Sequence, residues 1–107
     1  RHDGLGLRHM LLRSMNGGEV GALRSAILKD LPQNDPGGYF MTTLQALVAH
    51  DFEMDATAAA LHVHRNTLRY RLRRLEEAIG MSLNQQETRF WLRLALELGP
   101  ITEGVGL

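Results

Sequence analysis

The sequence predicts an all-α fold of about six helices that includes a helix-turn-helix. Every periodic stretch repeats apolar residues at helical spacing, and no stretch alternates convincingly as a β-strand does. A small-residue segment, 55–61, is followed by the tripeptide His62-Val63-His64 and then by an arginine-rich helix. A tight helix, a turn of about three residues and a second helix are the parts of a helix-turn-helix.

Two helices are expected in the first 34 residues. The first spans Leu5–Met15 and is stopped by the tripeptide Asn16-Gly17-Gly18. The second spans Glu19–Leu31 and ends at Pro32, because a proline cannot continue a helix. Together these helices should form a leading helical hairpin, residues 1–34.

A stretch rich in proline and glycine, Pro32–Gly38, marks the boundary to a second domain, residues 35–98. Its first helix is predicted over Tyr39–His50, and Asp51–Met54 is a short connector. Asp55 is the predicted N-cap of the next helix, since its carboxylate can accept from the exposed amides of the first turn.

The arginine-rich helix can be oriented by angle, at about 100° per residue. The inward stripe consists of Leu68, Leu72, Leu75 and Ile79. The opposite face presents Asn66, Tyr70, Arg73 and Glu77. One flank carries Arg65 and Arg69, and the other carries Thr67, Arg71 and Arg74. Gly80 is expected to end the helix in a left-handed conformation.

A last helix is predicted up to Leu98, where Gly99-Pro100 stops it. The pair Asn84 and Glu87 has the spacing of a capping pair at its start, and residues 99–107 are expected to be a frayed tail. The large apolar side chains of this last helix should form core under the arginine helix, although part of their surface could instead be a dimer interface. These side chains are Phe90, Trp91, Leu94, Ala95 and Leu98.

Charge distribution favours a nucleic-acid partner more than the net charge does. The net charge is zero, but five of the twelve basic residues lie within residues 65–74, which contain no acidic residue. Phosphate contacts require only one basic face.

The chain has no cysteine, which excludes disulfides and thiolate metal sites. No apolar run approaches the ~18 residues of a membrane span, and no signal peptide is visible.

These features lead us to expect sequence-specific binding of double-stranded DNA. Arginine can bind guanine through two hydrogen bonds, and asparagine can do so with adenine. The residues expected to contact bases are Arg65, Asn66, Arg69, Tyr70 and Arg73. The residues expected to contact phosphates are Thr67, Arg71 and Arg74. No catalytic residues, metal or cofactor are expected, so the chain is predicted not to be an enzyme.

Parts of the same sequence also fit other functions. The arginine face could simply be solvated, or it could bind an acidic partner in a helical protein-interaction or dimerisation module. His50, His62 and His64 could supply imidazoles to a metal, but no carboxylate or thiolate stands at ligand spacing around them. His64 is more simply a residue that caps or enters the second helix.

Residues 57–75 closely resemble the carboxy-terminal helix-turn-helix of the PucR/CdaR family of bacterial transcriptional regulators. The most specific part is the string His64-Arg65-Asn66-Thr67-Leu68-Arg69-Tyr70-Arg71-Leu72, and the likeness covers about residues 38–98. The connector 51–55 departs from the family's usual short turn.

The resemblance implies a Fis-like helix-turn-helix at the end of a longer, cytoplasmic chain. Because the sequence begins with Arg1 rather than Met, we expect it to be a piece of such a protein. The leading hairpin would then link to an upstream sensor domain, where a small-molecule effector binds. Regulators of this kind commonly bind promoter DNA as homodimers.

Overall fold

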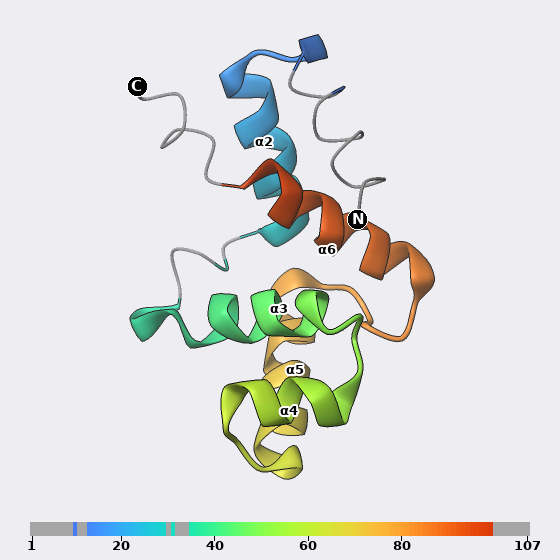
Figure 1. The fold of residues 1–107 in the computed structure, drawn as a ribbon. Coiled ribbons are helices and arrows are strands. Elements are labelled where there is room, and N and C mark those ends of the chain that lie inside the picture. The colour runs from blue at the N-terminus through green and yellow to red at the C-terminus, as the bar shows by residue number, and fades with distance from the viewer. Residues whose placement is uncertain (1–9, 11–12, 30, 32–34, 100–107) are drawn as a thin grey trace.

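The computed structural model describes residue 10 and residues 13–29, 31 and 35–99. Within this part of the chain the fold is all-α, as predicted, and contains no strand. Five α-helices and one short 3-10 helix follow in order: α2 Gly17–Leu28, η1 Pro36–Gly38, α3 Tyr39–Ala49, α4 Met54–Leu61, α5 Arg65–Ile79 and α6 Gln86–Leu98. Figure 1 shows α2 and α6 at one end of the molecule and α4 and α5 at the other, with α3 between them.

Helix α2 begins two residues earlier than the sequence indicated. Asn16 was expected to help stop the preceding helix, but it is the N-cap of α2: its side chain accepts from the Glu19 amide at 2.7 Å. The Glu19 carboxylate accepts from the Asn16 amide at 3.0 Å, which completes a capping box. Reciprocal capping therefore turns an apparent stop signal into a start signal.

The other end of α2 also differs from expectation. The helix ends at Leu28 rather than Leu31, because Lys29 leaves the helical region at φ 57°. The expected first helix, Leu5–Met15, lies largely outside the described residues. Of its described residues, Met10 is helical, and its carbonyl accepts from the Ser14 hydroxyl at 2.9 Å.

A buried carboxylate fixes the start of α3. Asp35 lies ahead of η1 and is 9% exposed. Its two oxygens accept from the amides of Phe40 and Met41 at 3.0 and 2.9 Å. Gly37 and Gly38 both have left-handed φ angles, +80° and +70°, which return the chain over Asp35. The predicted turn before α3 therefore also supplies, through Asp35, the cap of this helix.

The connector between α3 and α4 contains two consecutive left-handed residues that are not glycine, Asp51 at φ 54° and Phe52 at φ 64°. Each costs roughly 1–2 kcal/mol in that conformation. Burial of the Phe52 ring offsets this cost, because the ring belongs to the hydrophobic core. The guanidinium carbons of Arg89 and Arg93 each lie 5.0 Å from its centroid. Packing from α6 therefore holds the connector in place.

Two capping predictions were wrong. The N-cap of α4 is Glu53, whose carboxylate accepts from the Ala56 amide at 2.9 Å, and Asp55 lies in the first turn. The N-cap of α6 is Gln85, without a side-chain cap bond, so Asn84 and Glu87 do not form a capping pair. In both cases, the tertiary path of the preceding loop selected a residue that capping preference alone would not choose.

Helix α5 follows the prediction closely. Leu68, Leu75 and Ile79 are fully buried, and Leu72 packs partly buried against the core. Gly80 ends the helix with φ 72°, as expected, and its amide donates to the Glu76 carbonyl at 2.8 Å. The apolar stripe therefore fixes which face of the helix is free.

One continuous core joins four of the five described α-helices, all except α4. It combines apolar side chains of α2 and of Leu31 with those of α3, α5 and α6. Among the apolar residues of α6, Leu94, Ala95 and Leu98 are buried, Trp91 is partly buried, and Phe90 is 47% exposed. The core reading of this helix is confirmed for all but Phe90, whose ring stands edge-on to Trp91 at 5.2 Å.

Candidate nucleic-acid interface

The turn between α4 and α5 has a defined geometry. His62 ends α4 in the left-handed region at φ 59°, and the Val63 amide donates to the Ala58 carbonyl at 3.1 Å. This is the six-residue bond of a Schellman motif, formed here with histidine in place of glycine. His64 is the N-cap of α5, as one reading of the sequence indicated: its Nδ1 accepts from the Asn66 amide at 3.0 Å. The turn thereby sets the angle at which α5 leaves α4.

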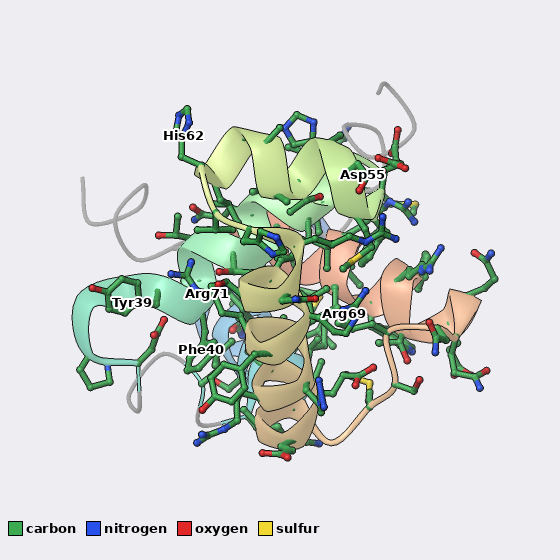
Figure 2. All side chains as sticks on the ribbon, turned by 90° about the horizontal axis from the view of Figure 1, so that it is seen from below. Tyr39, Phe40, Asp55, His62, Arg69 and Arg71 are labelled. Carbon is green, nitrogen blue, oxygen red and sulfur yellow. The ribbon has the colours of Figure 1, made fainter. Side chains whose placement is uncertain are left out.

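The outward face of α5 carries the predicted side chains. Seven of the eight site residues are exposed, and only Arg71 is partly buried. In Figure 2, Arg69 and Arg71 project to opposite sides of α5, as the helical angles predicted. The remaining site residues are Arg65, Asn66, Thr67, Tyr70, Arg73 and Arg74.

Two of these arginines are held by neighbours. Arg65 Nη1 lies 2.9 Å from Asp55 Oδ1, in an ion pair that joins α5 to the first turn of α4. Arg69 Nη1 donates to Asn66 Oδ1 at 2.8 Å, one turn earlier on the same helix. The contact with Asp55 could not be predicted from local patterns, because the two residues are ten positions apart.

Arg74 contacts both an aromatic ring and a carboxylate. Its Nη1 donates to the Tyr70 hydroxyl at 3.1 Å, and its guanidinium carbon lies 6.0 Å from the Tyr70 centroid. Its Nε is 3.4 Å from Glu77 Oε1. In the free protein, the positive charge of Arg74 is therefore partly balanced by the Glu77 carboxylate. Tyr70 remains 56% exposed.

Three further side chains complete the face. Neither Arg73 nor Thr67 has a side-chain hydrogen bond or ion pair with another described residue. Arg71 has its guanidinium carbon 5.4 Å from the centroid of Tyr39, the first residue of α3. Tyr39 was not among the predicted site residues, since a tyrosine opening an amphipathic helix carries no signal of its own.

The arrangement is suited to binding an anion over an extended surface rather than to catalysis. Five guanidinium groups lie within three turns of one helix, and only Arg65 and Arg74 pair with a carboxylate among the described residues. In the same part of the chain, no cluster of histidine and carboxylate side chains could hold a metal ion. No described helix is long and apolar enough to cross a bilayer.

This scaffold and its basic face define a DNA-binding helix-turn-helix domain. Residues 40–98 match the PucR C-terminal helix-turn-helix domain. The chain belongs to that family, which consists of transcription regulators rather than enzymes, and the resemblance seen in the sequence is confirmed.

Three relatives named as regulators illustrate the likeness. The carbohydrate diacid regulator of Escherichia coli strain K12 is 37% identical over 89 residues, covering 83% of this chain and 23% of that protein. The purine catabolism regulatory protein of Bacillus subtilis strain 168 is 36% identical over 67% of this chain and 17% of its own length. The transcriptional activator PmfR of Paenarthrobacter nicotinovorans is 38% identical over 69% of this chain and 16% of its own length.

The chain thus spans less than a quarter of the length of these three relatives. No significant match was found among solved structures.

Proposed function

We propose that this chain binds specific double-stranded DNA sequences in promoters, as the C-terminal domain of a larger regulator. The observation that carries the proposal is the outward face of α5, where exposed arginine, asparagine and tyrosine side chains lie opposite a buried leucine stripe. Helices of this kind lie in the major groove and present polar side chains to base edges.

The contacts within the chain refine the division between bases and phosphates. Arg73 points outward without a partner among the described residues, so its full fork of donors is available to a guanine. Asn66 Oδ1 already accepts from Arg69, which leaves its amide N–H groups to bind a base edge. Arg65, Arg69 and Tyr70 complete the base-contacting group, while Thr67, Arg71 and Arg74 contact phosphates from one flank.

Within a full-length regulator, the domain would act in the cytoplasm as part of a homodimer. Two-fold symmetry would place half-sites about 34–36 Å apart, or at a multiple of that spacing. Residues 1–34 would link residues 35–98 to an upstream domain that binds a small-molecule effector. The relatives support a larger regulator, because the shared segments cover only 23% and 17% of their own lengths.

Fluorescence anisotropy with random-sequence duplex DNA, titrated across a salt series, tests the proposal. We expect dissociation constants of about 10⁻⁴–10⁻⁶ M that weaken linearly with the logarithm of salt concentration. An Arg69→Ala/Arg73→Ala variant should bind more weakly, because it removes two positive charges from the basic face.

A matched control removes two charges elsewhere. Arg13→Ala/Lys29→Gln eliminates two exposed basic side chains outside the helix-turn-helix and should bind DNA like the unmodified protein. A folded protein that shows no salt-dependent binding would contradict the proposal and favour an acidic protein partner for α5. Equal losses in both double variants would show that only overall charge matters.

A further inference from the structure

Tyr39 lies outside the helix-turn-helix but beside the helix that carries its basic face. It is the first residue of α3, and its side chain is 61% exposed. The guanidinium carbon of Arg71 lies 5.4 Å from its ring centroid. Figure 2 shows Tyr39 on the side of α5 toward which Arg71 projects, opposite Arg69. The surface beside the basic face of α5 therefore includes the start of α3.

The backbone before α3 holds this tyrosine in place. Asp35 anchors the start of the helix through the amides of Phe40 and Met41. Gly37 passes so close to the Tyr39 ring that an added Cβ would lie 3.3 Å from it. The ring is consequently packed against its own backbone on one side and contacted by Arg71.

The donors at this point are side chains rather than the helix end. Asp35 already occupies two of the first amides of α3, so the N-terminus of the helix offers little to an external anion. Arg71 makes no hydrogen bond or ion pair with another described residue, and neither does the Tyr39 hydroxyl. A cation–π contact uses the charge of the guanidinium and leaves its N–H groups available.

We propose that Tyr39 and Arg71 together bind one backbone phosphate of the duplex, on the strand that borders the groove occupied by α5. Arg71 supplies charge and N–H donors, and Tyr39 adds a hydroxyl donor and keeps the guanidinium in place through its ring. This inference rests on the proposed DNA-binding function and extends its contact surface to α3. Thr67, one turn before Arg71, lies on the same flank.

Four variants test the pair by anisotropy on random-sequence duplex across a salt series: Tyr39→Phe, Tyr39→Leu, Arg71→Ala and Tyr39→Leu/Arg71→Ala. Tyr39→Phe keeps the ring and removes only the hydroxyl, so it should weaken binding about three- to tenfold. Tyr39→Leu should weaken binding at least as much, because it also frees Arg71. Arg71→Ala should lower the salt slope by about one phosphate contact.

The double variant should lose less than the sum of the single losses, since both residues bind the same phosphate. Phe90→Leu, which removes another exposed aromatic ring from α6, should bind like the unmodified protein. Losses should be equal on random and operator sequences, because phosphates carry no sequence information.

Unchanged binding by both Tyr39 variants, with the unmodified protein binding normally, would overturn this inference alone. Absence of duplex binding by the unmodified protein would overturn the proposed function together with it. Additive losses in the double variant would show that Tyr39 and Arg71 contact different groups, which would also contradict a shared phosphate.

Discussion

Arg65 pairs with the Asp55 carboxylate in the free protein, and this carboxylate lies where a DNA phosphate would approach the basic face. Both side chains of this ion pair are exposed to solvent, Asp55 at 71% and Arg65 at 52%. Ion pairs as exposed as this contribute little to stability. The Asp55 charge therefore matters more for its effect on an approaching phosphate than for the fold.

We predict that Asp55→Asn tightens binding to random duplex DNA by about two- to fivefold at low salt, because it removes a carboxylate beside the basic face. The gain should shrink as salt rises, since exposed charges are screened. Anisotropy at two salt concentrations measures both effects, and a thermal melt should change little. Weaker binding would instead mean that Asp55 orients Arg65 for its contact.

Arg73 provides the clearest single test of base recognition. It is exposed and has no hydrogen bond or ion pair with another described residue, so its removal should leave stability almost unchanged. On a selected operator, Arg73→Ala should cost about 1–3 kcal/mol of binding free energy and relax the preference at one base pair. An equal loss on all sequences would reassign Arg73 to a phosphate.

At the scale of the elements, the caps decide where α4 begins. Glu53→Ala should lower the free energy of unfolding by about 0.5–2 kcal/mol, since it leaves the Ala56 amide without its acceptor. Asp55→Ala is the matched control, because it removes a neighbouring acidic side chain that caps nothing. Chemical denaturation of both variants distinguishes the two positions; a larger loss for Asp55→Ala would restore the original capping prediction.

The inward stripe of α5 is not uniform. Leu75 is fully buried, whereas Leu72 only packs partly buried at the edge of the core. Leu75→Ala should therefore destabilise the fold by about 2–5 kcal/mol, as a truncation that leaves a cavity. Leu72→Ala should cost less, because water can reach the vacated space. Urea denaturation compares the two, and equal losses would mean that Leu72 is as buried in solution as Leu75.

At the scale of the whole molecule, α2 contributes core to the domain that carries α5. Val20 and Leu28 are 1% and 0% exposed and share one hydrophobic cluster with α6 residues such as Leu92. Figure 1 shows α2 alongside α6, far from α4. Helix α2 thus adds to the core of this domain without approaching α4.

A fragment beginning at residue 35 should therefore melt at a lower temperature than the full chain. Removal of residues 1–34 exposes the α6 surface that α2 covers, and the lost apolar burial is not replaced. Thermal unfolding followed by circular dichroism compares the two chains. Where both are folded, their DNA affinities should agree. Identical melting temperatures would contradict a shared core and would support residues 1–34 as an independent hairpin.

Local patterns in the sequence were sufficient for the all-α class, the extent of α5 and its apolar stripe. Gly80 and His64 were also placed correctly, because their roles depend on neighbours within one turn of the chain. The strength of the family resemblance has the same origin, since its most specific string lies within a single helix and its cap.

Tertiary structure decided everything that depends on contacts between distant segments. The N-caps of α4 and α6 follow from the paths of their loops, and the left-handed Phe52 is held by Arg89 and Arg93 from another helix. The pairing of Arg65 with Asp55 and the position of Tyr39 beside Arg71 likewise arise only when α4 and α3 pack on α5. Periodicity orients each helix about its own axis, but only packing determines which side chains of different helices meet.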